Sequence, residues 1–196
     1  MGVVTFRCRL DGRYCTRFWI PVTHLDLWRL YYYGDFRDLT GFVRFVDADD
    51  PDAEPKPILF NGRYVHLALA ERGGGCVFLE GARCRVHSFK PLVCRFYPFV
   101  YVVRGDGEVD IEVNERDVGE CPGLVLDDRP TDPGIADYLR RVARARIAEL
   151  KLWSEAAEEW SRDYGRGSDL DELLDYLLRR ARGDFAELSQ RGMWIR

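Results

Sequence analysis

Six cysteines are the side chains of this chain best suited to chemistry. In chain order they are Cys8, Cys15, Cys76, Cys84, Cys94 and Cys121. Deprotonated cysteine is a ligand for zinc, for iron–sulfur clusters and for copper(I). The spacing Cys76-x7-Cys84-x9-Cys94 matches neither the C-x2-C pairs of a zinc ribbon nor the close run of a bacterial ferredoxin. The cysteines therefore predict a metal or iron–sulfur site without specifying which.

The residues next to the cysteines strengthen this prediction. Cys84 and Cys94 are flanked by three arginines, and positive charge favours the thiolate that binds metal. His87 lies between two of these cysteines and could bind metal, although packing is the commoner role of such a histidine. Asp11 could be a hard ligand, but its place before Gly12 is equally explained by a turn. The flanking arginines are Arg83, Arg85 and Arg95.

Disulfides are the alternative to metal. Lysine occurs only three times and the other basic residues are arginines, a composition typical of a thermophile or of a GC-rich genome. Because intracellular proteins of hyperthermophiles can be rich in disulfides, six cysteines could also pair as bridges. Four thiolates complete one tetrahedral zinc or one four-iron cluster, so two cysteines are surplus to a single site.

The stretch from Cys76 to Pro98, CVFLEGARCRVHSFKPLVCRFYP, resembles the second motif of the YkgJ-type cysteine-cluster proteins, a zinc- or iron-chelating domain. That motif reads roughly C-x-F-L-x4-C-x-I-Y-x2-R-P-x2-C-R-x-F-P. The family's first motif, roughly F-x-C-x2-C-G-x-C-C before an L-T-x2-D-x2-R-L helix, is similar to residues 6–30. This chain departs from it at Asp11 and Tyr14, which stand where the family has its second and third cysteines.

The resemblance spans residues 6 to about 123 and implies a metal or iron–sulfur site. It leaves the biochemical role open. Because Asp11 and Tyr14 replace two thiols, a site that requires all four N-terminal cysteines cannot form. The ligands that the resemblance implies are Cys8, Cys15, Cys76, Cys84, Cys94 and, less directly, Cys121.

The N-terminal cysteines must be positioned by short elements. Residues 3–10 and 13–20 are expected to be extended segments joined by a tight turn at Asp11-Gly12. A helix is expected next, with Thr23 and Asp26 as a capping box and Gly34 as its left-handed stop. Residues 35–46 are expected to be helical or irregular, before an exposed loop rich in acids and prolines.

Two further signals frame the later cysteines. Alternating apolar residues predict a strand over 63–70. Gly73 to Gly75, directly before Cys76, indicate either a flexible turn or a backbone that closely approaches a bulky group. Residues 99–104 and 108–114 are expected to form a hairpin around Gly105-Asp106-Gly107.

The last third of the chain is predicted to be helical. Asp132 and Pro133 begin a long helix, and Ser168 with Asp171 begins a second one that ends near Gly183. The apolar stripe of the long helix is Tyr138, Val142, Ala145, Ala148, Leu152, Ala156, Trp160 and Tyr164.

These elements predict an α+β fold. We expect residues 1–128 to form a cysteine-cluster region with short hairpins and an N-terminal helix, and residues 129–196 to form a helical segment packed on it. A net charge of −4 and a pI near 5.5 do not indicate binding to nucleic acid or to anionic lipid. A protein partner at the arginines of the last two helices is possible, but a solvated helix face is the commoner role of such residues. No secretory or membrane-spanning segment is visible, so we expect a cytoplasmic protein.

The sequence therefore supports two hypotheses. The first is a metal-binding protein carrying an iron–sulfur cluster on its cysteines, with a possible redox or modification role and no predicted catalytic residue. If it is an enzyme, the reactive place would be an open coordination position near Asp11. The second is a non-catalytic interaction protein whose cysteines hold structural zinc or form disulfides.

Overall fold

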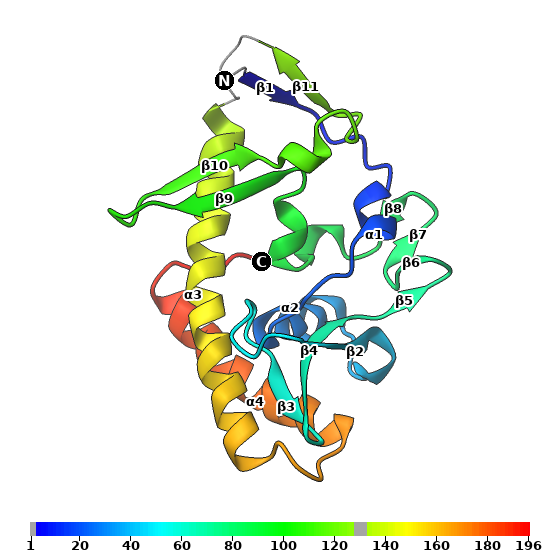
Figure 1. The fold of residues 1–196 in the computed structure, drawn as a ribbon, viewed down its shortest axis with the longest axis vertical. Helices are drawn as coiled ribbons and strands as arrows, with labels where there is room; N and C mark the ends of the chain where they lie inside the picture. The colour runs from blue at the N-terminus through cyan, green and yellow to red at the C-terminus, as the bar shows by residue number, and fades with distance from the viewer. Residues whose placement is uncertain (1–2, 128–132) are drawn as a thin grey trace.

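A three-stranded sheet lies with the second and fourth helices in the lower half of the molecule, two antiparallel strand pairs lie in the upper half, and the long third helix runs along both (Figure 1). The computed structural model describes residues 3–127 and 133–196, and the architecture is α+β as predicted. The helices are α1 (Arg13–Arg17), α2 (His24–Gly34), α3 (Pro133–Asp163) and α4 (Leu170–Gln190). The three-stranded sheet holds β2 (Val43–Asp47), β3 (Ile58–Phe60) and β4 (Arg63–Leu69).

The strand predicted from residues 63–70 is β4, at the centre of the antiparallel order β2-β4-β3. Leu67 lies opposite Phe45 on one side of it, and Val65 lies opposite Ile58 on the other. The alternating pattern predicts one buried face, yet His66 and Ala68 are buried as well. Strand β2 and strand β3 were not predicted, since the first lies in the segment expected to be helical or irregular.

The N-terminal hairpin prediction is wrong. Strand β1 (Val3–Phe6) pairs in antiparallel register with β11 (Leu124–Asp127), so its partner lies at the far end of the cysteine region. Residues 13–17 form α1 instead of a strand. Gly12 has a left-handed φ of 72°, which turns the chain directly into this helix.

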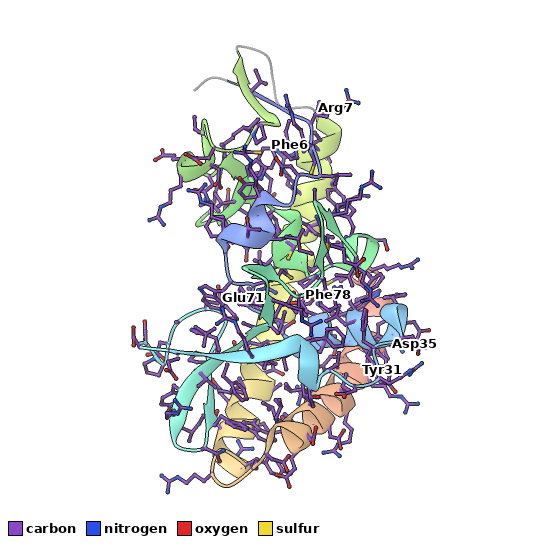
Figure 2. The ribbon with its side chains drawn as sticks, turned by 90° about the vertical axis from the view of Figure 1, so that its right-hand side faces the viewer. Phe6, Arg7, Tyr31, Asp35, Glu71 and Phe78 are labelled. Carbon is purple, nitrogen blue, oxygen red and sulfur yellow. The ribbon has the colours of Figure 1, made fainter. Side chains whose placement is uncertain are left out.

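The capping box of α2 is confirmed. The Thr23 side chain accepts a hydrogen bond from the Asp26 amide, and the Asp26 side chain accepts one from the Thr23 amide. The left-handed residue at the other end is Asp35, with a φ of 56°, and Gly34 is the last helical residue. Figure 2 shows Tyr31 and Asp35 together at this outer end of the helix.

The later cysteines sit on two minimal hairpins. Strand β5 (Glu71–Arg72) pairs with β6 (Gly75–Cys76), and β7 (Leu79–Glu80) pairs with β8 (Arg83–Cys84). Gly73 and Gly74 form the turn between β5 and β6, both with positive φ. Short 3-10 helices η2 (His87–Phe89) and η3 (Leu92–Arg95) follow.

The predicted hairpin after the cysteine stretch is confirmed as β9 (Phe99–Val103) and β10 (Val109–Val113). Its apolar face, with Phe99 and Val109 buried, packs against Leu139 and Val142 of α3. Two further 3-10 turns are η1 (Thr40–Phe42) and η4 (Glu115–Asp117).

Both predicted C-terminal helices exist, with shifted ends. Pro133 is the first residue of α3, and the predicted cap Asp132 lies outside the described residues. Helix α4 is capped one residue later than predicted, by Asp169 with Glu172, and it continues through Gly183 to Gln190. Glycine lowers helix stability only modestly, and the packed faces on either side of it hold the helix together.

The buried face of α3 differs from the predicted stripe. Tyr138 and Tyr164 are exposed, while Arg146 and Glu149 are buried. These two charged side chains form a network with α2. Arg29 binds Glu149 through its two terminal guanidinium nitrogens, one of them at 3.0 Å. The Asp26 carboxylate forms salt bridges with the guanidinium groups of Arg29 and Arg146, each at 3.2 Å. Two positive and two negative side chains therefore compensate each other between the helices.

Helices α3 and α4 contact α2 and the sheet, and the largest apolar cluster takes residues from both sides of residue 128. A boundary between two regions at that residue remains a prediction. Among the described residues no helix is both long and apolar enough to span a bilayer.

Candidate metal centre

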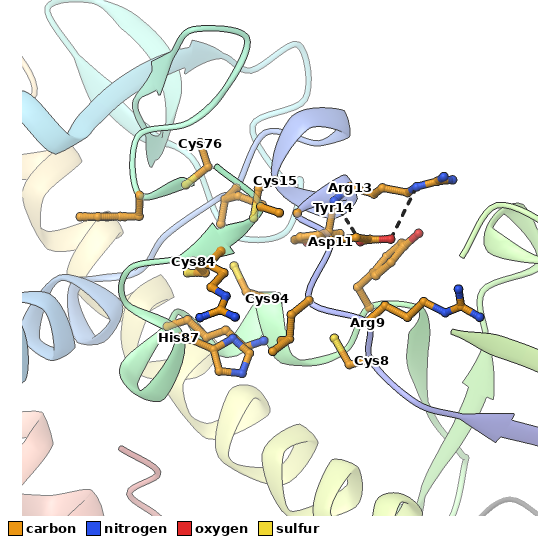
Figure 3. A pocket seen from close by; sticks show the side chains of 18 of the residues that line it. Cys8, Arg9, Asp11, Arg13, Tyr14, Cys15, Cys76, Cys84, His87 and Cys94 are labelled. Atoms are coloured by element: carbon orange, nitrogen blue, oxygen red, sulfur yellow. Dashed lines mark hydrogen bonds and ion pairs between the residues drawn. The ribbon is translucent and has the colours of Figure 1, made fainter. Parts of the chain in front are cut away.

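All six cysteines line one cavity of about 380 Å³, and all six are free thiols. The cavity lies where the N-terminal loop, the two minimal hairpins and η3 meet. Figure 3 shows Cys15, Cys76, Cys84 and Cys94 gathered on one side and Cys8 apart from them. We call these four the inner group, and we call Cys8 and Cys121 the outer pair, since the Arg7–Gly123 backbone hydrogen bond brings their segments together.

Each inner cysteine comes from a different short element. Cys15 lies on α1, Cys76 ends β6, Cys84 ends β8 and Cys94 lies in η3. Phe78, between the two hairpins, is buried and stacks on Phe42 with ring centroids 5.2 Å apart. This ring anchors both hairpins to the core.

Two glycines let the N-terminal loop approach the hairpins. A Cβ on Gly75 would come within 3.2 Å of the Cys15 carbonyl oxygen, so α1 lies directly on β6. A Cβ on Gly12 would come within 2.9 Å of Leu79, and its positive φ already disfavours other residues. The loop carrying Cys15 therefore packs beside Cys76 because both contact positions lack side chains.

Burial, and to a lesser extent the neighbouring thiols, favours the protonated form of the inner cysteines. Burial, followed by the neighbouring Cys76 and Cys84, raises the pKa of Cys15 to about 11. Burial also raises the pKa of Cys76, with a contribution from Cys84. The pKa of Cys94 is raised well above its usual range by burial, and Cys76 and Cys15 add to this rise. Such mutual repulsion of thiolates is relieved when a cation binds between them.

Backbone amides already favour two of these thiolates. The Phe78 amide donates to the Cys76 sulfur and the Val86 amide donates to the Cys84 sulfur, and each bond lowers the pKa of its thiol against the rise due to burial. Amide hydrogen bonds of this kind stabilise the charged form of a ligand sulfur. The donor set at the inner end therefore fits a thiolate-ligated metal or cluster.

Lys90 is the cation that acts on the inner group, lowering the pKa of Cys15, Cys84 and Cys94. The sequence instead predicted the flanking arginines for this role. Arg95 donates to the Tyr138 hydroxyl at 3.1 Å and to the Lys90 carbonyl at 3.3 Å, so its charge is directed toward α3. Lys90 is not adjacent to any cysteine in the sequence, so an inspection of the residues that flank each cysteine could not identify it.

The outer pair has different surroundings. The Arg7 amide binds the Gly123 carbonyl at 2.9 Å, which brings the chain at Cys8 beside that at Cys121. Burial and the nearby Asp117 and Cys121 raise the pKa of Tyr97 to about 12. The Tyr97 hydroxyl is thus a neighbour of Cys121.

The two positions that depart from the family pattern are placed differently. Asp11 lines the cavity but accepts the Arg13 amide at 3.3 Å and pairs with the Arg13 guanidinium at 3.6 Å. Tyr14 lines the cavity beside the inner group: burial, and then Cys94 and Cys15, raise the pKa of its hydroxyl, and its ring lies 4.9 Å from the Tyr97 ring. His87 also lines the cavity and is exposed. In the part of the chain that the structure describes, no three Cys, His, Asp or Glu side chains lie close enough to hold one metal ion.

An α+β fold with four thiols gathered at one cavity defines a cysteine-cluster metal-binding protein. The chain belongs to the CxxCxxCC family, described as "Putative zinc- or iron-chelating domain", which matches residues 7–122. It is also similar to the Uncharacterized protein MJ0661 of Methanocaldococcus jannaschii, with 24% identity over 110 residues. That match covers 55% of this chain and 59% of the relative, so the chain spans less than two thirds of it. No solved structure matches the chain.

Proposed function

We propose that the protein carries an iron–sulfur cluster on the thiolates of Cys15, Cys76, Cys84 and Cys94. The observation that carries this proposal is the meeting of these four thiols at one cavity, two of them already accepting amide hydrogen bonds. Four cysteines are the ligand set of both [2Fe–2S] and [4Fe–4S] clusters. Cys8 and Cys121 are surplus ligands in this proposal.

The size of the cavity supports a cluster over a single ion. Four sulfurs bound to one zinc at ~2.3 Å lie about 3.8 Å apart and leave no room between them. Here the thiols line a cavity of about 380 Å³, and no three potential ligands among the described residues are spaced for one ion. A cluster of several metal and sulfide ions fills a wider space between the same thiolates.

The charges around the cavity also suit an anionic centre. Four thiolates outweigh the charge of the metal that they bind, so such a centre is negative overall. Arg9, Arg83 and Lys90 line the cavity, and within residues 3–127 and 133–196 none of their charged side-chain groups forms a hydrogen bond or an ion pair. These three cations can compensate the centre without breaking existing pairs.

A bound cluster would supply one-electron transfer, which none of the side chains provides. The chain's own residues would bind it through the four thiolates, orient two of these by the Phe78 and Val86 amides, and limit water through buried Phe78 and Val86. The redox or modification role that follows is a proposal. The structure gives no support to an open metal-coordination position at Asp11, because Arg13 already binds the Asp11 carboxylate.

Anaerobic purification tests the proposal. We expect a brown protein with iron and acid-labile sulfide in about equal amounts, near four of each for a [4Fe–4S] cluster. A colourless protein with one zinc per chain would contradict it and would support the structural-zinc alternative. A metal-free protein without titratable thiols would support disulfides, and with them a non-catalytic interaction role.

A further inference from the structure

The turn that carries Cys94 is fixed from the side of α2. The Leu92 amide donates to Asp26 Oδ1 at 3.1 Å, inside the protein. Leu92 begins η3, and the Cys94 amide donates to the Pro91 carbonyl at 3.0 Å, so the turn is a single hydrogen-bonded unit. A carboxylate 66 residues earlier in the chain therefore sets where Cys94 lies.

Asp26 is itself held by several donors. Its Oδ2 accepts the Thr23 amide at 3.2 Å and the Arg146 guanidinium at 3.2 Å. Its Oδ1 accepts Arg29 at 3.2 Å in addition to Leu92. The side chain is fully buried, and the two guanidinium groups compensate its charge. A carboxylate with this many partners has one position, so Leu92 binds a fixed acceptor.

The other end of the same turn is fixed by α3. Arg95 reaches the Lys90 carbonyl at 3.3 Å and the Tyr138 hydroxyl at 3.1 Å. The elements of the other inner thiols are held differently: Cys76 and Cys84 end two-residue strands, and the short helix of Cys15 is tied to Glu120 by exposed bonds from Arg13 and Arg17. The turn of Cys94, by contrast, is held by a buried long-range hydrogen bond.

We propose that Asp26 is a positioning residue for the metal centre, which fixes the turn of residues 91–94 so that the Cys94 thiol is in place before metal binds. This inference rests on the proposed role of Cys94 as a ligand. Its physical basis is pre-organisation: a ligand that is already ordered loses less conformational entropy on binding. Partners behind a metal ligand typically change affinity by 10- to 100-fold.

The test compares Asp26→Ala with Glu149→Gln. Both remove a member of the buried charge network, but among the described contacts Glu149 binds only Arg29 and does not touch the turn. We expect Asp26→Ala, after anaerobic reconstitution with iron and sulfide, to lose its cluster absorbance to a chelator roughly 10- to 100-fold faster than the parent. Glu149→Gln should lose it at a rate within about threefold of the parent despite its lower thermal stability.

Equally faster cluster loss in the two variants, or cluster loss from Asp26→Ala within about threefold of the parent rate, would show that Asp26 only stabilises the fold. Hydrogen exchange of the metal-free parent gives a second test that needs no variant. The Leu92 amide should exchange as slowly as the amides in the middle of α2, and rapid exchange there would overturn the inference. If the parent cannot be reconstituted with iron and sulfide, the proposed metal centre fails, whereas the exchange rate of the Leu92 amide still tests whether Asp26 fixes the turn.

Discussion

At the scale of single residues, the cavity separates cysteines that the sequence presents as equivalent. Besides burial, Cys76 and Cys84 raise the pKa of Cys15, and Cys76 and Cys15 raise that of Cys94, so each of the four lies within electrostatic reach of at least one other. Cys8 is exposed, and Cys121 lies next to Tyr97. A shared cation is the simplest way to relieve the repulsion within the inner group.

We predict that serine at any of the four inner positions abolishes stable cofactor binding, because three thiolates remain for a four-ligand centre. Serine at Cys8 should leave the metal content of anaerobically purified protein close to that of the parent. Metal analysis and visible absorbance of the five variants test this. A loss of metal in Cys8→Ser equal to that in Cys94→Ser would contradict the division into inner and outer groups.

A second residue-scale prediction concerns pH. His24 Nε2 lies 2.8 Å from Asp184, and Arg180 donates to the same carboxylate at 3.1 Å. Burial would raise the pKa of Asp184, but the bonds from His24 and Arg180 outweigh burial and hold that pKa below its usual range. A carboxylate whose pKa is depressed in the folded protein stabilises the fold at pH values above its pKa in the unfolded chain, about 3.9. This contribution is lost as the pH falls through the pKa of the folded protein.

Asp184→Asn should therefore lower the free energy of unfolding by about 1.5–3 kcal/mol at pH 7. The difference from the parent should disappear at acidic pH, where the parent carboxylate is protonated. Urea denaturation at several pH values measures this, and Asp175→Asn, on the exposed side of the same helix, is the matched control. A constant difference down to pH 2 would show that charge is not the cause.

At the scale of elements, α2 and α3 are joined by charges where an apolar contact would be expected. Arg29 is fully buried, binds Glu149 and lies 4.1 Å from the Trp194 ring. Burial raises the pKa of Glu149, and the Arg29 guanidinium opposes that rise. Removing one partner leaves the other charge buried with fewer compensating contacts.

We expect Glu149→Gln to destabilise the metal-free protein by about 3 kcal/mol. Glu187→Gln, which removes an exposed i,i+4 pair with Arg191, should change stability by less than about 0.5 kcal/mol. Denaturant titration of both variants measures the two effects. Equal effects would mean that the buried pair contributes no more than a surface pair.

At the scale of the whole molecule, the cysteine region and the helices differ in how they are held. The hairpins β5–β6 and β7–β8 have two residues a strand, whereas α3 and α4 bury wide apolar faces. Metal ligands from four elements would join the N-terminal loop to these hairpins. Bound metal should therefore order the cysteine region much more than the helices.

We predict that chelation increases hydrogen exchange in residues 8–17 and 71–95 while the centres of α3 and α4 stay protected. Mass spectrometry of exchanged peptides with and without chelator measures this. Loss of protection in all elements together would show that metal supports the whole fold. The pattern would also test the predicted division near residue 128.

Local signals were sufficient for much of the fold. The capping box at Thr23, the alternation over residues 63–70 and the hairpin after Pro98 depend on neighbouring residues, and each prediction is confirmed. Predictions failed where a partner is distant in sequence. Strand β1 pairs with β11, and the Asp11-Gly12 turn leads into a helix, because contacts from more than a hundred residues away decide both.

The sequence alone determined the chemistry that is available: six thiols, their family pattern and the two positions where thiols are missing. Tertiary structure decided which thiols meet, since sulfur atoms far apart in the chain interact only after the loop of Gly12 packs on the hairpins. It also decided that Asp26, Arg29, Arg146 and Glu149 are buried together. From the sequence alone, each of these charged residues would be expected at the surface. Only the three-dimensional arrangement brings each one the opposite charge that makes its burial possible.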